Sequence, residues 1–334
     1  MKSSLWNAMA CVGSVVGAGF ASGREIMVFF TQYGKHSWWL IGWAAGLMAW
    51  ICSLSVRHAQ DGGWYRLISG RMEQSCTLLL LFITGGAMVS AAGQMIALVW
   101  VNKQAYWLSA VGTLILAWAV GMGNTRVLGC LGSGLSVLLV CVLLAVRLHL
   151  PSSHAAVQLQ PVKQVSLMAV VRAAGYAAMN MTLAIGVVSR CPKKRGVPWL
   201  FGLSIAGLMG VSNALYLQHP EMMQEPFPIV RLLAAFGRTG FVTSVCLLYL
   251  AIFTTLVSVV GTVRTALESW FHKRLQVIGL SLLPMLCLSA AGFSGIVERM
   301  YAPAGLLCFI LIFVPLFRNR DQEKLDKAAF DTVR

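Results

Sequence analysis

The chain is built mainly of apolar stretches of about 20 residues, the length that a helix needs to cross the hydrocarbon core of a bilayer. Of its 334 residues, 58% are hydrophobic and only 11% are charged. A soluble domain has about a quarter of its residues charged, so this deficit excludes soluble enzymes and favours a membrane protein. The first apolar stretch continues to Phe30 without a small-residue cleavage pattern, so we expect a membrane span there and not a cleaved signal peptide.

Hydropathy predicts ten membrane spans in one transmembrane domain, residues 1–317, followed by a cytoplasmic tail, residues 318–334. Five spans occupy residues 5–148 and five occupy residues 166–317, so the second set enters the membrane from the opposite side. We therefore expect an all-α membrane protein with a five-plus-five inverted repeat, the plan of many secondary transporters. The predicted spans are approximately residues 5–31, 37–56, 75–100, 105–122, 127–148, 166–189, 197–217, 240–264, 275–291 and 295–317.

The net charge of +15 comes from Lys and Arg in short clusters between spans, not along one face. This distribution argues against nucleic acid as a partner. With the N-terminus inside, seventeen Lys and Arg lie on the inner side and eight on the outer side, with Arg24 inside the first span. The positive-inside rule then predicts cytoplasmic termini. The membrane that we expect is a bacterial inner membrane. The expected partners are the lipid bilayer and a small-molecule substrate, and the oligomeric state is not predicted.

The first span carries four glycines within eleven residues, Gly13 to Gly23. Each glycine weakens a helix by up to about 1 kcal/mol relative to alanine. A helix broken in mid-membrane needs protein, water or a ligand to satisfy its freed backbone groups, so this segment is a candidate site. The alternative is close packing of helices through small residues.

Two charged residues, Arg24 and Glu25, follow the glycines inside the same span. Charges at this depth are costly unless they face a cavity or an opposite charge. Glu25 is therefore a candidate to bind a substrate amine or to exchange a coupling proton. The alternative is a local ion pair between the two residues. Near the membrane edges, we expect Glu268 and Glu298 to pair with the adjacent arginines, Arg264 and Arg299.

The run from Val16 to Ile26, with Phe29-Phe30 and Gly34 after it, resembles the signature of the YkvI family of bacterial membrane proteins. That family belongs among the amino acid–polyamine–organocation type carriers, so the resemblance implies the LeuT fold. It also implies a first and a sixth span that are both broken at a substrate site. Where the family usually has Gln, this chain has Arg24. The site residues that the resemblance implies are Gly17, Ala18, Gly19, Phe20, Ser22, Gly23 and Glu25, with Tyr176 and Asn180 of the sixth span.

The same resemblance implies a candidate sodium site. In sodium-coupled carriers of this type, hydroxyls of the eighth span meet carbonyls of the first. Here the corresponding residues are Val16, Gly17, Thr254, Thr255 and Ser258. The alternative is that these hydroxyls bond to carbonyls of their own helix. The coupling ion, Na⁺ or H⁺, stays open, and no other cofactor is expected.

The remaining motifs give no sign of an enzyme or of a metal centre. The nine cysteines have irregular spacing, and the six histidines fall at span ends or between spans. The function that we expect is a secondary carrier of a small amino acid or amine. The alternative is a ligand-sensing, permease-like receptor subunit without net transport, and a channel is disfavoured because no filter-like repeat occurs. Between the seventh and eighth spans, we favour a loop over a short external helix for residues 221–237.

Overall fold

The computed structural model describes residues 11–60, 71–100, 102–121, 164–188, 196–271 and 273–313, and the single positions 8, 138, 142 and 145. These residues are almost entirely helical, and they include no β-strand. Six of the helices are long and apolar enough to cross a membrane, which makes the chain an all-α, multi-pass membrane protein. They are α4 (Ser37–Gln60), α6 (Arg71–Trp100), α7 (Lys103–Gly121), α9 (Leu167–Val188), α10 (Gly196–Leu217) and α12 (Gly237–Glu268).

These six helices correspond to the predicted spans 2, 3, 4, 6, 7 and 8. The predicted span 5, residues 127–148, lies outside the described residues apart from three single positions. The first span is helical over residues 11–15 and then consists of three short pieces. These pieces are α2 (Ala18–Ser22), α3 (Arg24–Phe29) and η1 (Thr31–His36), which leads into α4.

The C-terminal part departs from the two straight spans that the sequence predicts. Helix α13 (Arg274–Ser289) matches the ninth span, but α14 (Phe293–Arg299) turns away from it by 93°. The turn is made at Gly292, whose φ of 77° favours glycine. After Met300 the chain continues as α15 (Tyr301–Cys308) and a π-helical turn, η3 (Phe309–Phe313). The prediction of one uninterrupted helix from residue 295 is therefore wrong.

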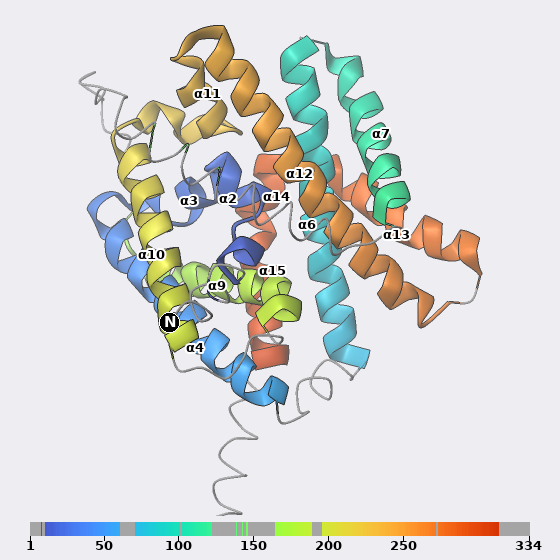
Figure 1. Ribbon diagram of the computed structural model, residues 1–334, viewed down its shortest axis with the longest axis horizontal. Coiled ribbons are helices and arrows are strands. Elements are labelled where there is room, and N and C mark those ends of the chain that lie inside the picture. Colours follow the sequence, from blue (N-terminus) through green and yellow to red (C-terminus); the bar gives the residue numbers. More distant parts are fainter. Residues whose placement is uncertain are drawn as a thin grey trace, which may run out of the picture.

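The described helices pack in two groups, which Figure 1 shows at the left and right of the molecule. Helices α4, α9 and α10 form one group, and α6, α7, α12 and α13 form the other. Helix α15 lies between them, against α9 on one side and α6 on the other. The first span is also central, because α2 contacts α12 while α3 contacts α9, α10 and α14.

Helices α9 and α15 approach until their backbones touch. A Cβ on Gly175 would lie 2.7 Å from the Ala302 carbonyl oxygen, and one on Gly305 would overlap the carbonyl of Gly175. Such contacts through small residues are typical of helix association in lipid. The glycines of the third span serve the same purpose, because Gly85 and Gly86 lie against Met285 and Leu288 of α13.

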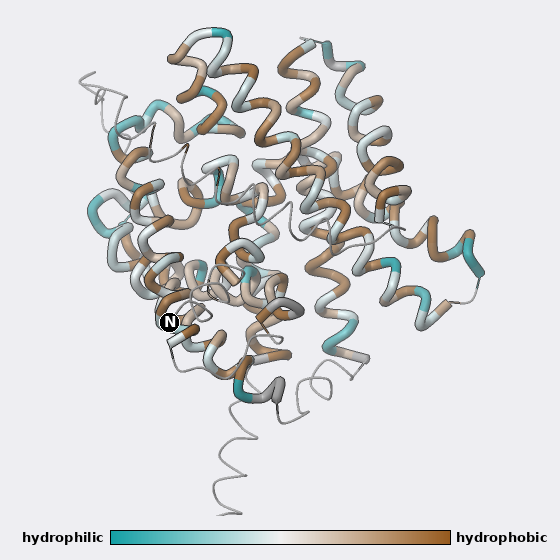
Figure 2. The backbone as a smooth tube through the Cα atoms, in the orientation of Figure 1, coloured by the Kyte–Doolittle hydropathy of each residue, from teal (hydrophilic) through white to brown (hydrophobic). Residues whose placement is uncertain are grey.

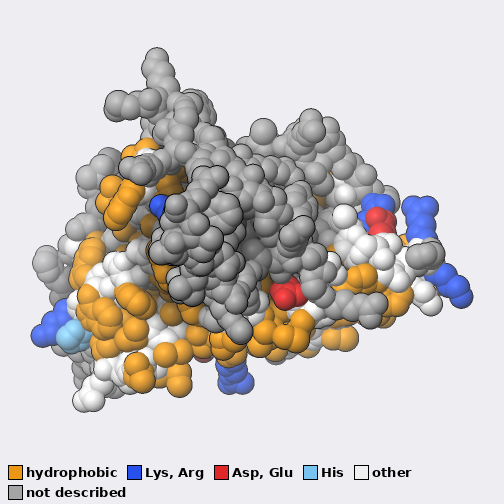
Figure 3. All heavy atoms as spheres, turned by 90° about the horizontal axis from the view of Figure 1, so that it is seen from below, with side chains coloured by type: hydrophobic (Ala, Val, Ile, Leu, Met, Phe, Trp, Pro, Cys, Tyr) orange, Lys and Arg blue, Asp and Glu red, His pale blue; other side chains and the backbone are white. Residues whose placement is uncertain are grey.

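The surface of the described part is mainly apolar. Hydrophobic residues recur along the length of the helices in Figure 2, and Figure 3 shows hydrophobic side chains over much of the described part of one face, with Lys and Arg mostly at its margins. Large exposed side chains include four tryptophans of α4. An aqueous surface rarely carries so large an apolar area, whereas lipid solvates it. The tryptophans are Trp38, Trp39, Trp43 and Trp50.

Residues 221–237 are more helical than predicted. They contain the end of a 3₁₀ turn, η2 (Pro220–Gln224), and a short helix, α11 (Pro228–Ala234). Pro228 is at the first position of α11, where a missing N–H costs nothing. Ile229, Val230 and Leu232 are buried, because α11 packs against α12 and α2. The preference for a loop was therefore wrong for residues 228–234.

The packing of α6 against α15 can be tested through two buried thiols. The Sγ atoms of Cys76 and Cys308 lie 3.4 Å apart, so a small movement brings them to bonding geometry. We expect copper phenanthroline to join them in a variant whose other seven cysteines are replaced by alanine. Mass spectrometry of the digest should find the linked peptide pair, and an added Cys76→Ala change should abolish it. Failure to form the link would contradict this helix packing.

Candidate functional site

The helical hydrogen bonds of the first span continue to the Val16 N–H, which donates to the Val12 carbonyl, and are interrupted at Gly17. The Gly17 N–H donates to the Val15 carbonyl oxygen at 2.9 Å, and Gly17 has an extended backbone with φ −93° and ψ −171°. Helix α2 then begins at Ala18. The break predicted from the glycine cluster is present, and it lies where the first span faces α12.

A second irregularity separates α2 from α3 at Gly23, whose φ of 83° is left-handed. A side chain there would also overlap the ring and hydroxyl of Tyr216 on α10, so both conformation and space require glycine. Ser22 stabilises the junction. Its hydroxyl donates to the Gly19 carbonyl at 2.7 Å and accepts the N–H of Arg24 at 3.1 Å.

Glu25 is directed back toward the first part of the broken span. It is 5% exposed, and its carboxylate lies so close to Gly19 that any side chain at position 19 would overlap it. Gly19 is therefore needed to make room for an acidic side chain. The structure brings the two predicted site residues into direct contact.

Two tyrosines from other helices lie beside this carboxylate. Tyr176 of α9 is a hydrogen-bonding partner of Glu25, and Tyr301 of α15 is close enough to interact with it electrostatically. The Tyr301 hydroxyl is buried and has no hydrogen-bond partner among the described residues. Within the same part of the chain, no Lys, Arg or His forms an ion pair with Glu25.

Aromatic rings surround Tyr176. Its ring centroid is 4.9 Å from that of Phe29 and 5.4 Å from that of Phe30, the second pair meeting edge to face. The guanidinium of Arg172 lies over the Phe29 ring, 5.8 Å from its centroid. An aromatic wall of this kind, next to a carboxylate, suits an organic cation.

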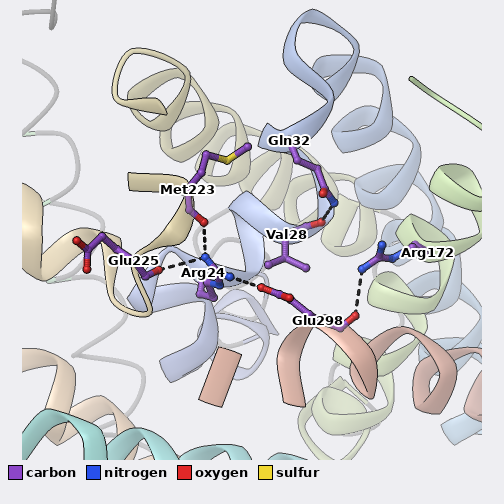
Figure 4. Close-up of polar contacts among 7 residues, drawn as sticks. All are labelled: Arg24, Val28, Gln32, Arg172, Met223, Glu225 and Glu298. Carbon is purple, nitrogen blue, oxygen red and sulfur yellow. Dashed lines mark hydrogen bonds and ion pairs between the residues drawn. The ribbon is translucent and has the colours of Figure 1, made fainter. Parts of the chain in front are cut away.

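Arg24 connects α3 to α14 and to the end of η2, as Figure 4 shows. Its guanidinium forms an ion pair with Glu298 of α14. It also donates to the Met223 carbonyl and, at 3.2 Å, to the Glu225 carbonyl, so it anchors the end of η2 and the start of the segment that follows. Arg172 approaches Glu298 from its other side and donates to the backbone carbonyl at 3.1 Å.

One predicted ion pair is therefore wrong, one is confirmed, and the ion pair considered as the alternative for Arg24 and Glu25 is absent. Arg24 does not pair with Glu25, because consecutive residues on a helix point about 100° apart. Glu298 pairs with Arg24 rather than with its neighbour Arg299. The pair between Arg264 and Glu268 is present, with Nε and Oε1 2.7 Å apart.

The remaining predicted substrate residues, Ala18, Phe20, Tyr176 and Asn180, are buried, and the Asn180 amide bonds within its own helix. Ala18 and Phe20 are buried on α2. The amide of Asn180 donates to the Tyr176 carbonyl one turn earlier, at 3.0 Å, instead of bonding to another helix. Helix α9 is continuous through Gly175 and Asn180, so the break that the resemblance implied for the sixth span is absent. Gly175 is used for the contact with α15 instead.

The candidate sodium residues are only partly brought together. A Cβ on Gly17 would lie 3.8 Å from the Thr255 Oγ1 atom, so this hydroxyl faces the break beside Val16. Thr254 is buried, but Ser258 is exposed. The hydroxyls of Thr254 and Thr255 both donate to the Ala251 carbonyl, at 3.1 and 2.8 Å, as the alternative predicted. The described residues contain no group of three or more His, Cys, Asp or Glu side chains that suits a metal ion.

Four contributors to the site were not predicted: Tyr301, Glu298, Arg172 and Tyr216. They come from α15, α14, α9 and α10, and their proximity to the first span depends on tertiary packing. Only Arg172 had a sequence signal, because an arginine six positions into an apolar span needs a partner. Comparison of the sequence with protein-family models gave no match, and neither did comparison with curated proteins.

The anchoring role of Arg24 predicts a local effect on the segment after η2. Arg24→Ala removes its two donations to carbonyls, each worth about 1.5–3 kcal/mol for a charged donor. We expect amide hydrogen exchange over residues 220–236 to accelerate at least about tenfold. Hydrogen-exchange mass spectrometry in detergent measures this. Glu298→Gln is the matched control, because it removes the ion pair but keeps both carbonyl contacts, and equal rates in both variants would contradict the role.

Proposed function

We propose that the chain is a secondary active transporter of a small amino acid or amine, driven by a sodium or proton gradient. The observation that carries the proposal is the break in the first span, with the buried Glu25 carboxylate folded back onto it. Irregular backbone at membrane depth is characteristic of solute sites in carriers. A buried carboxylate that lacks a basic partner in the described part of the chain is suited to bind a cation.

The proposal includes a LeuT-type five-plus-five repeat of the YkvI kind. The two packing groups support it, since carriers of this plan move one helix group against another around a central site. The central place of α2 and α3, between the groups, supports it as well. The bias of Lys and Arg between the two sides supports cytoplasmic termini in a bacterial inner membrane.

Alternating access then requires the contacts of the first span to change. Glu25 is 5% exposed, so a solute reaches it only after the helices around it separate. On one side, Arg24 connects α3 to α14 and to the segment after η2. On another, α2 meets α12 at Gly17 and Thr255. Motion between the helix groups has to open one set of contacts while the other stays closed.

The direct test uses purified protein in liposomes and labelled amines and amino acids. We expect saturable uptake that collapses when the driving gradient is dissipated, and a reduction of at least about tenfold in Glu25→Gln. Glu268→Gln is the matched control, because it makes the same change at an exposed surface pair. Tight binding without uptake would instead favour the sensing subunit. Unaltered binding and uptake in Glu25→Gln would overturn the site assignment.

The placement of the hydroxyls favours protons over sodium as the coupling ion. Thr254 and Thr255 both donate to Ala251, and Ser258 is exposed. We therefore expect uptake to persist when potassium replaces sodium, and Thr255→Val to change it by no more than about twofold. Thr262→Val is the control, since Thr262 is exposed and bonds only to the Ser258 carbonyl. Loss of uptake in potassium, together with a raised sodium requirement in Thr255→Val, would restore the sodium site.

A further inference from the structure

We infer that the Glu25 carboxylate binds the ammonium group of a small amine and a proton in turn, which makes the protein an amine–proton exchanger. The inference rests on the proposed function and narrows both its substrate class and its mode of coupling. It depends on three properties of the site: a single uncompensated carboxylate, a set of acceptors that fits an ammonium group, and burial of both.

The first property is that basic side chains near Glu25 are engaged elsewhere. Arg24 is paired with Glu298 of α14 and donates to the carbonyls of Met223 and Glu225 at the end of η2. Arg172 of α9 lies over Phe29 and donates to the Glu298 carbonyl. The titratable groups that face the site from other packed helices are hydroxyls, on Tyr176 of α9, Tyr301 of α15 and Tyr216 of α10. The negative charge therefore has no permanent counter-ion in the described part of the chain.

The second property is the chemistry of the surrounding atoms. An ammonium group has three N–H donors, and the Glu25 carboxylate offers acceptors on two oxygens. The buried Tyr301 hydroxyl adds an acceptor that no described residue occupies. Tyr176, which bonds to Glu25, brings an aromatic ring beside the carboxylate. A carboxylate on the substrate would meet the same negative group, since both nearby arginines already contact Glu298. The site therefore prefers an amine to the corresponding amino acid.

The third property is the burial of the Glu25 carboxylate, and it requires that a protonated amine be exchanged for a proton. A bare carboxylate is disfavoured in a low-dielectric interior, so the site changes access only when a cation neutralises it. A proton and an ammonium group both do so, and they cannot occupy the carboxylate together. One protonated amine therefore crosses in one direction and one proton returns in the other. The cycle moves no net charge, because each half-cycle carries a single positive charge on the same carboxylate.

Proton release on binding tests the shared carboxylate in detergent. The probes are ethylamine and isobutylamine, each paired with the amino acid that adds only a carboxylate, alanine and valine. Calorimetry in buffers of different ionisation enthalpy should show amine binding that releases up to one proton, with affinity falling as the solution becomes more acidic. We expect alanine and valine to bind at least about tenfold more weakly. Glu25→Gln should abolish both binding and release, whereas Glu268→Gln should preserve them.

Flux measurements separate failure of this inference from failure of the proposed function. An acid interior should drive amine uptake into liposomes beyond the passive uptake seen in protein-free and Glu25→Gln vesicles. Counterflow of labelled amine without response to the proton gradient would leave the carrier standing and overturn the exchanger. Binding with proton release, but without counterflow or uptake, would retain the shared carboxylate and overturn transport. Equal affinity for amine and amino acid, or binding without proton release at any pH, would overturn the inference itself.

Discussion

The backbone of a membrane protein must satisfy its hydrogen bonds within the protein, and this constraint organises the whole molecule around its first span. Gly17 and Gly23 interrupt the helix, so the segment has to be enclosed by other helices. Helices α9, α10, α12 and α14 supply that enclosure. The interior that results is also the place where an acidic side chain can be kept out of lipid. The break and the buried Glu25 are thus two consequences of one arrangement.

The position of the Glu25 carboxylate depends on how closely it can approach the backbone of α2 at Gly19. Gly19 has no side chain, so the Glu25 carboxylate lies directly against the backbone of α2. On a different face of α3, about 100° around the helix, Arg24 reaches Glu298 and the end of η2. Arg24 and Glu25, although adjacent in sequence, therefore have different roles. Arg24 holds neighbouring segments in place, whereas Glu25 has tyrosine hydroxyls beside it and no ion-pair partner in the described part of the chain.

Much of this fold follows from local sequence, and the limits of prediction have a physical cause. Six helices could be predicted because about 20 mainly apolar residues with few charges define a span by themselves. The break in the first span was predictable from its glycines. The same reasoning failed at Gly175, where glycine serves contact with α15 and α9 stays helical. A sequence does not distinguish these two uses, because the difference lies in the partner helix.

Long-range partners were equally inaccessible. Arg24 and Glu298 are 274 positions apart, and the 93° turn before α14 brings them together. Sequence proximity predicted Arg299 as the partner of Glu298, since nothing in the local pattern indicated the turn. Tyr301 was missed for the same reason: it reaches Glu25 only because α15 starts after that turn. The site is therefore a product of topology as much as of its own motif.

The contact between α9 and α15 has a mechanical consequence. Where two backbones touch, as at Gly175 and Gly305, a change in the contact has to move the main chains themselves. We therefore expect α9 and α15 to move together as one rigid unit. Helix α15 meets α6 through side chains, including the thiols of Cys76 and Cys308, and such an interface can slide. The close backbone contact with α9 and the side-chain contact with α6 lie on opposite sides of α15. We therefore expect any movement between the two helix groups to occur at the contact of α15 with α6.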